Sequence, residues 1–451
     1  MSKGASGMDV NTLICETLGI QELNIEKLNF NREQQKLNIF GKLTFKSARC
    51  LCCNNSFFEH HQWHDKTIRV PTLGIYSEVY LHLKFPRGFC LICEKVTPPK
   101  LDFIHPEFKG LSCSFVETAG RLAEETTCAS ASRIMKCNRK TLWKIDQWRM
   151  NYMKNNLYQT PKNLDLSFMS ADEVHFLTER PKKRLSPFCP RYLVKYITNL
   201  VCSKHSKILF NAPENNFKAL QTCLKQLSKE DCEKVLFFAL DMNEGYFNAV
   251  SKLCPNAEIA VDRYHLVESL NRVFNKLRQE EFSKAKKRKD EFQAGMLEAG
   301  RKFILMERNP ALSMEEKNML GKLKMLNTNI NAGMLIMDLF HKLLDQKSLK
   351  RFRKKLAQWY QVVRESKLKS FKKFALKIMK YRKHIEAYIK SNLTTAVSEG
   401  LNNKIKVFKR AGYNYTNEDS FKNKILQRCG FLNSTYINTN FLYWHVPTPQ
   451  N

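Results

Sequence analysis

Four cysteines in the first quarter of the chain have the spacing of a metal site. The pairs Cys50/Cys53 and Cys90/Cys93 are Cys-x-x-Cys motifs, and two such motifs complete the tetrahedral coordination of one Zn²⁺ ion. Four sulfur ligands leave no open position, so this site would be structural rather than catalytic. The alternatives are free cysteines, or a ligand set that includes one of the neighbouring side chains Cys52, His60, His61 and His64.

Two aspartates in the second half of the chain directly follow short apolar runs. Asp241 ends the run that begins at Val235, and Asp262 ends the run 259–261. Each run has the length of a buried strand, and a helical pattern follows each aspartate. Strands that alternate with helices indicate a parallel sheet, in which the carboxyl ends of the strands form the ligand crevice. Both carboxylates would lie at that edge, unless each only caps the helix that follows it.

Three further strands precede these two. We expect strands at 166–176, 192–202 and 207–210, and a helix at 215–227. Three antiparallel strands followed by helix, strand, helix and strand match the order of a ribonuclease-H-like fold. In that fold the first and fourth strands are neighbours, so Asp172 in the first strand would lie close to Asp241.

A single helix is expected at 394–410, where Val397, Leu401, Ile405 and Phe408 would form the buried stripe. Glu399 lies on another face, which it shares with Asn403, Lys406 and Arg410. A surface glutamate usually has a lysine four residues later, but here that position is Asn403. Glu399 beside amide and basic groups therefore fits a metal ligand next to a phosphate backbone.

The remaining segments are mostly helical. Residues 107–155 read as three short helices, with a capping box from Ser114 to Glu117 at the first and Asn138 as the N-cap of the third. The third helix begins with Arg139, Lys140 and Lys144, which resembles a helix-turn-helix reader of DNA; an ordinary helical linker is the alternative. Residues 281–391 form a basic, all-α insertion.

Composition narrows the class of protein. The 451 residues suffice for two or three domains, and 75 Lys and Arg against 43 Asp and Glu give a net charge of +32. Such an excess favours a polyanionic partner, with nucleic acid as the first candidate. No apolar run reaches the roughly 20 residues of a membrane span, and no secretion signal is evident at the N-terminus. The 15 cysteines are therefore expected as thiols or metal ligands in a reducing compartment.

The local sequence around the acidic residues resembles that of the ISL-three family of bacterial insertion-sequence transposases. The matching stretches are Ala-Asp172-Glu, Leu-Asp241-Met, Asp262-Arg-Tyr-His265 and Ser-Glu399-Gly-Leu-Asn-Asn-Lys-Ile-Lys, and the resemblance spans almost the whole chain. It implies a ribonuclease-H-like core, a catalytic triad of Asp172, Asp241 and Glu399 that holds two Mg²⁺ (or Mn²⁺) ions, and accessory roles for Asp262 and His265. The first cysteine motif departs from the family pattern through its extra Cys52.

The resemblance also implies a function and partners. The protein would bind the terminal inverted repeats of an insertion sequence, cut the DNA ends and join them to target DNA, as a homodimer or larger assembly associated with the bacterial nucleoid in the cytoplasm, without a membrane partner. DNA contacts would come from Arg139, Lys140, Lys144, Asn403, Lys406 and Arg410. An inactive zinc-dependent DNA-binding regulator and a Mg²⁺-dependent nuclease of the same fold remain as alternatives.

These expectations give an α+β multidomain architecture. It comprises an N-terminal segment (1–45), a zinc-ribbon-like domain (46–105), a helix-turn-helix domain (106–160), the first part of the catalytic core (161–280), the helical insertion (281–391), and the last core helix with the C-terminal tail (392–451).

Overall fold

A computed structural model describes residues 10–18, 20, 23–43, 49–57, 59–158, 161, 163–179, 192–299, 313–391, 393, 395–412 and 415–437. The chain divides into two compact units: Met1–Thr160 with Val407–Asn451, and Pro161–Lys406. Each unit is described by itself below. No helix in the described ranges combines the length and the apolar character needed to cross a bilayer.

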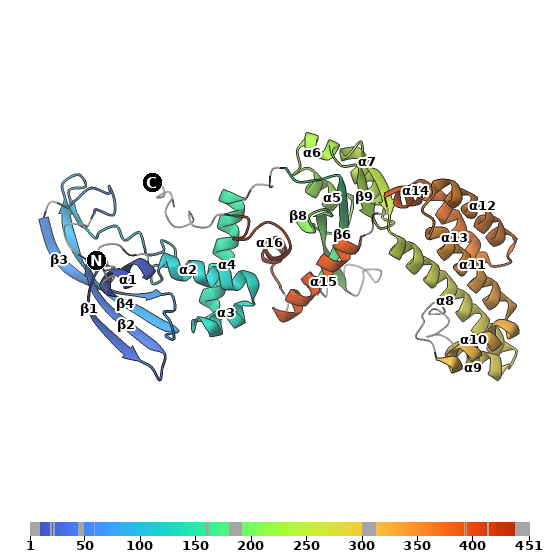
Figure 1. Cartoon of the computed structure of the whole chain (residues 1–451), viewed down its shortest axis with the longest axis horizontal. Helices are drawn as coiled ribbons and strands as arrows, with labels where there is room; N and C mark the ends of the chain where they lie inside the picture. The colour runs from blue at the N-terminus through green and yellow to red at the C-terminus, as the bar shows by residue number, and fades with distance from the viewer. Residues whose placement is uncertain are drawn as a thin grey trace, which may run out of the picture. The chain divides into compact units, whose positions relative to one another are not determined.

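A five-stranded sheet forms the N-terminal part of the first unit (Figure 1). Its strand order is β1-β2-β4-β3, and the short β5 pairs with β4. The elements are α1 (Val10–Leu18), β1 (Leu23–Asn31), β2 (Lys36–Leu43), β3 (Glu59–Val70), β4 (Glu78–Cys90) and β5 (Lys95–Thr97). Burial alternates along β2, so one face of the sheet packs on a core that includes Ile39, Ile68 and Leu81. Residues on both sides of position 45 therefore share one sheet and one core.

Helices complete the first unit: α2 (Cys113–Glu125), α3 (Cys128–Ile134), α4 (Arg139–Tyr152), a π-helical turn (Met153–Leu157) and α16 (Glu418–Cys429). Asn138 caps α4 as expected, because its side chain accepts from the Lys140 N–H. The expected capping box at α2 is wrong: Ser112, not Ser114, accepts from the Phe115 N–H. Glu117 instead pairs with the fully buried Arg149 of α4, at 3.2 Å.

The sheet of the second unit has the order β10-β9-β6-β7-β8. Strands β6 (Phe168–Glu179), β7 (Leu193–Cys202) and β8 (Lys207–Pro213) are antiparallel, whereas β9 (Phe237–Leu240) runs parallel to β6 and β10 (Glu258–Val261) runs parallel to β9. The connecting helices are α5 (Phe217–Leu224), α6 (Lys229–Glu233) and α7 (Glu244–Leu253). The expected adjacency of the first and fourth strands of this sheet, β6 and β9, is confirmed.

A helical region follows β10. It contains α8 (Arg263–Lys287), α9 (Glu291–Ala299), α10 (Met314–Leu326), α11 (Thr328–Leu344), α12 (Leu349–Glu365), α13 (Lys369–Lys380) and α14 (Arg382–Ser391). Figure 1 shows α8 leading away from the sheet to α9 and α10, with α11 to α14 along the same side. Trp359 lies in the core of this helical region. Its indole N–H donates to the Ile336 carbonyl at 3.1 Å, and its ring packs against Phe340.

The last long helix, α15 (Ala396–Ala411), begins in the second unit. The first residue expected in this helix, Thr394, lies outside the described residues. The expected buried stripe is only partly correct. Ile405 and Phe408 are buried, but Val397 and Leu401 are half-buried, and the polar Ser398 and Asn402 are buried in their place.

Candidate functional site

Strand register places Asp172 and Asp241 opposite one another. The parallel pairing of β6 with β9 runs from Phe168↔Phe237 to Ser170↔Ala239. Each aspartate lies two residues beyond that last pair, so the same register continued would set them side by side. Directly paired residues of neighbouring strands project from the same face of a sheet, and the strands are about 4.8 Å apart. Two strands distant in sequence thus bring two carboxylates to one place.

Burial and mutual repulsion raise the pKa values of Asp172, Asp241 and Glu173, three side chains that are called the carboxylate pocket below. Burial raises the pKa of Asp172 above its ordinary value, and the charge of Asp241 raises it further, although His265 acts in the opposite direction. Burial likewise raises the pKa of Asp241. The neighbouring Glu173 has its pKa raised to about 7 by burial and by the charges of both aspartates. Three carboxyl groups that repel one another would all ionise more easily beside a cation.

Two oxygens in this pocket are buried without a hydrogen-bond partner among the described residues: Asp241 Oδ1 and Glu173 Oε2. Buried carboxylate oxygens are normally paired, and an unpaired one can accept a hydrogen bond from a water or coordinate a cation. Mg²⁺ prefers such oxygen ligands and keeps several waters. The donor set and its two unpaired oxygens therefore fit a divalent cation.

Asp241 and Asp262 have similar sequence surroundings, but only Asp262 caps the helix that follows it. Asn243, not Asp241, caps α7, because its side-chain oxygen accepts from the Gly245 and Tyr246 N–H groups. Asp241 is therefore left available for another role. Asp262 does cap α8, where it accepts from the Tyr264 N–H at 2.9 Å. It also accepts from the backbone and hydroxyl of Thr395, which fixes the chain just before α15.

Helix α15 contacts the carboxylate pocket through Asn402. Its Nδ2 donates to Asp172 Oδ2 at 2.8 Å and to the Glu173 carbonyl at 3.3 Å. One turn earlier, Ser398 Oγ lies 2.7 Å from Ser170 Oγ on β6. Asn402 had not been singled out from the sequence, because a buried position on an amphipathic helix is normally apolar. A sequence pattern does mark Asn402: Ser398 and Asn402 are polar, are four residues apart, and lie on the same helix face as the buried Ile405.

Glu399 lies next to Ser398 on the same helix and is exposed. It lines a cavity of about 380 Å³ together with Asp262 and Tyr264, and neither Asp172 nor Asp241 lines that cavity. The three acids do not form one compact ligand cluster. In two-metal sites the ions are about 3.5–4 Å apart, so ligands of different ions need not converge on one point.

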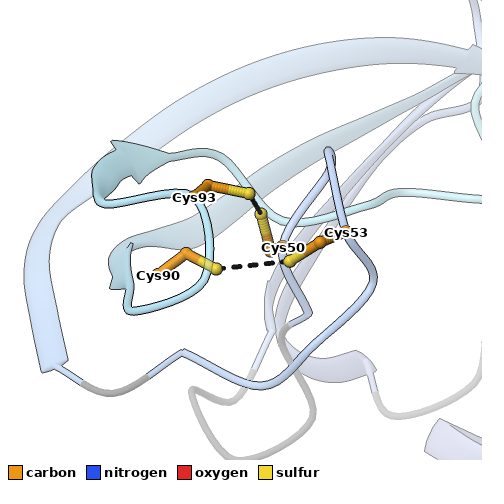
Figure 2. Close-up of side chains that lie close together, drawn as sticks. All are labelled: Cys50, Cys53, Cys90 and Cys93. Atoms are coloured by element: carbon orange, nitrogen blue, oxygen red, sulfur yellow. Dashed lines mark hydrogen bonds between the residues drawn. The ribbon is translucent and has the colours of Figure 1, made fainter.

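The four cysteines do converge (Figure 2). The Sγ atoms of Cys50, Cys53, Cys90 and Cys93 all lie within 4.8 Å of one another, and among the described residues they are the only His, Cys, Asp or Glu group of three or more to do so. The Cys50–Cys93 and Cys53–Cys90 sulfur distances are 3.8 and 3.3 Å. Tetrahedral zinc with Zn–S bonds of about 2.3 Å needs roughly 3.8 Å between sulfurs.

The competing ligands are outside this cluster. Cys52 is exposed beside it, and the histidines at 60, 61 and 64 lie on β3 rather than with the four sulfurs. Burial acts to raise the pKa of the Cys50 thiol, but hydrogen bonds with the Thr97 hydroxyl and from backbone N–H groups outweigh it and lower that pKa to about 6. The pKa values of the Cys90 and Cys93 thiols are raised instead by burial and by the neighbouring sulfurs, so ionisation of all four thiols would require a cation among them.

The expected DNA-contacting side chains are exposed. Arg139, Lys140 and Lys144 lie in the first two turns of α4, on the solvent side opposite the buried Leu142 and Ile145. Along α15, Asn403, Lys406 and Arg410 are exposed as well. Exposure permits contact with a phosphate backbone but does not distinguish it from an ordinary solvated face.

Comparison with known proteins identifies the family to which the chain belongs. Residues 191–425 match the family model of ISL3-type DDE transposases, described as a transposase. The chain is 22% identical over 413 residues to the transposase for insertion sequence element IS1001 of Bordetella parapertussis, covering 90% of this chain and 95% of that protein. The chain belongs to the ISL3 (ISL-three) family of transposases, which confirms the resemblance seen in the sequence.

Proposed function

We propose that this protein is a Mg²⁺-dependent DNA transposase that cuts the ends of an insertion sequence and joins them to target DNA. The observation that supports this most directly is the parallel register of β6 and β9, which brings Asp172, within β6, close to Asp241, the residue after β9. Their pocket contains an unpaired buried carboxylate oxygen, in a chain that belongs to a transposase family. The strand order β10-β9-β6-β7-β8 is the order expected of a ribonuclease-H-like core.

Each carboxylate has a separate role in this proposal. Asp172 and Asp241 bind at the centre of the pocket, and Asn402 orients Asp172 through its amide N–H. Glu399 completes the site from α15 once DNA and cations are bound. A pair of Mg²⁺ ions there would activate the attacking water or DNA 3′-hydroxyl and stabilise the leaving oxygen. His265 lies close enough to lower the pKa of both aspartates, and Asp262 holds the start of α8 in place.

The first unit would recognise the terminal inverted repeats. The four-cysteine cluster, holding zinc, would fix the segment before β3 against the turn between β4 and β5, and α3 and α4 would act as the helix-turn-helix. Arg139, Lys140 and Lys144 would contact the duplex, with phosphate contacts supplying most of the affinity and a few base contacts the specificity. On α15, Asn403, Lys406 and Arg410 would contact DNA close to the cut.

One assay tests this function. The purified chain is mixed with Mg²⁺ and labelled DNA that carries the end of its own element, taken from the sequence that flanks the gene. We expect a cut at the end and joining to a second duplex, both abolished in Asp172→Asn, Asp241→Asn and Glu399→Gln. Binding without either product would identify a regulator, and cutting without joining would identify a nuclease. Full activity in Glu399→Gln would remove Glu399 from the triad.

A further inference from the structure

Helix α13 has an exposed face that consists mainly of lysines, with Leu376 among them. Its exposed residues include Lys369, Lys372, Lys373, Lys377 and Lys380, and its opposite face is buried through Phe371, Phe374, Ala375 and Ile378. Spacings of three and four residues place these lysines in one row along the helix. The row is about 16 Å long at 1.5 Å per residue.

This row is electrostatically unfavourable in the protein alone. Like charges three or four residues apart on a helix destabilise it by a few tenths of a kcal/mol per pair. Within the described part of the chain, Lys380 is the one member of the row with an ion pair, to Glu244 on α7. The other helical lysines with acidic partners, such as Lys284 with Glu281 on α8, show how such repulsion is ordinarily relieved.

The lysine row ends at the carboxylate pocket. Lys380 pairs with Glu244, and the Tyr381 hydroxyl donates to the same carboxylate at 3.3 Å. Glu244 lies three residues after Asp241, so the C-terminal end of α13 is fixed beside the strand end that presents this aspartate. Lys377 is exposed one turn earlier on α13, so after Lys380 it is the member of the row nearest to this end of the helix.

We propose that the row Lys369, Lys372, Lys373 and Lys377 on α13 is a DNA-backbone track that leads one strand into the carboxylate pocket. Lys377 would contact the phosphate nearest the cut, where it positions the strand. Lys369 and Lys377 are about 12 Å apart along the helix at 1.5 Å per residue. Successive phosphates of one strand advance by about 3.4 Å along a duplex, so the track spans about four of them. The proposal extends the proposed transposase function by naming where the DNA lies on the helical region.

Duplex binding as a function of salt tests the track without requiring cleavage. The slope of log K against log salt falls by about 0.9 for each phosphate contact removed. The full-length chain is titrated with a labelled 30-base-pair duplex of arbitrary sequence, and the triple variant Lys369→Gln, Lys372→Gln, Lys373→Gln is compared with wild type. We expect its slope to be smaller by about 2.7.

The matched control removes three exposed lysines from other helices of the same region: Lys287→Gln, Lys317→Gln and Lys322→Gln, on α8 and α10. Figure 1 shows α10 at the end of this region away from the sheet. The control alters net charge equally, and we expect its slope to equal that of wild type. Equal losses in both triple variants, or no loss in the α13 variant, would overturn the track.

Lys377 is tested by single substitutions in the same titration. Lys377→Gln should lower the slope by about 0.9, whereas Lys377→Arg, which keeps the charge, should leave it unchanged. Circular dichroism establishes that both variants fold. A wild-type slope in Lys377→Gln would exclude Lys377 from the track. Because binding is the readout, these results stand even if the chain proves unable to cut DNA, which is the separate failure of the proposed function.

Discussion

Replacing Cys90 and Cys93 together by serine removes half of the four-sulfur cluster and should abolish zinc binding. The sulfur separations of 3.8 and 3.3 Å are close to the roughly 3.8 Å of a tetrahedral zinc–thiolate site. Structural zinc sites bind with about 10–16 kcal/mol at neutral pH. Loss of two of four ligands should forfeit about half of that, ~5–8 kcal/mol, which weakens zinc affinity by about four to six orders of magnitude.

The consequence should be local. Cys50, Cys90 and Phe57 form a small core of their own, separate from the core of the five-stranded sheet. We therefore expect the double variant to lose zinc and to be cleaved by protease within 49–57 and near residue 93, while its sheet stays folded by circular dichroism. Metal analysis of the purified protein should give one zinc per wild-type chain and none per variant chain.

The chain supplies a control at the adjacent position. Cys52 lies within the same motif but is exposed and outside the cluster, so Cys52→Ser should keep one zinc per chain and its protease resistance. The reasoning fails if Cys52→Ser loses zinc, or if the double variant retains zinc at wild-type affinity. Either result would mean that the sulfur geometry does not define the ligand set.

Three further predictions concern stability. Lys424→Met leaves the buried Asp146 carboxylate without its ammonium partner at 3.0 Å, and should lower the free energy of unfolding in urea by about 3–5 kcal/mol. The double variant with Asp146→Leu should recover most of this loss. A loss below about 1 kcal/mol in the single variant would contradict the prediction. Burial lowers the pKa of His105 to about 4 from 6.5. The contribution of neutral His105 to the free energy of unfolding is therefore fully present above pH 6.5 and should fall by on the order of 3 kcal/mol as the pH drops to 4. His105→Asn should remove this pH dependence, and identical pH profiles of the variant and the wild type would refute the prediction. Asp262→Ala should cost about 1–2 kcal/mol or more, because it removes the α8 cap and the acceptor of the Thr395 N–H; Asp262→Asn can keep only one of these and should cost less than Ala, and equal costs would show that the cap contributes nothing.

Sequence patterns sufficed for the strands that bear the carboxylates, because short apolar runs bounded by polar residues have few alternatives to a buried strand. They could not separate Asp241 from Asp262. Both follow a strand and precede a helix, and each could equally serve as an N-cap. The deciding residue was Asn243, whose amide oxygen takes the capping position two residues later and leaves Asp241 in the pocket.

The capping box at α2 failed for a related reason. Ser112 and Ser114 are both suitable N-caps, and Glu117 has the spacing of a box with Ser114. The choice depends on a partner from elsewhere in the chain: the buried guanidinium of Arg149 pairs with both Glu117 and Glu124. A buried arginine requires paired carboxylates, and this requirement outweighs a local cap worth about 1 kcal/mol.

The sequence pattern predicts the buried face of α15 only partly, and the physical reason lies in the residues around Asp172. The apolar-stripe rule assumes that a helix packs on an apolar neighbour. Here the neighbour is a strand that presents Ser170 and Asp172, so the helix buries Ser398 and Asn402 against them. Glu399 follows Ser398 directly and is therefore held near the edge of that contact. A polar pair in phase with an apolar residue is the pattern expected when a helix covers a carboxylate pocket rather than a core.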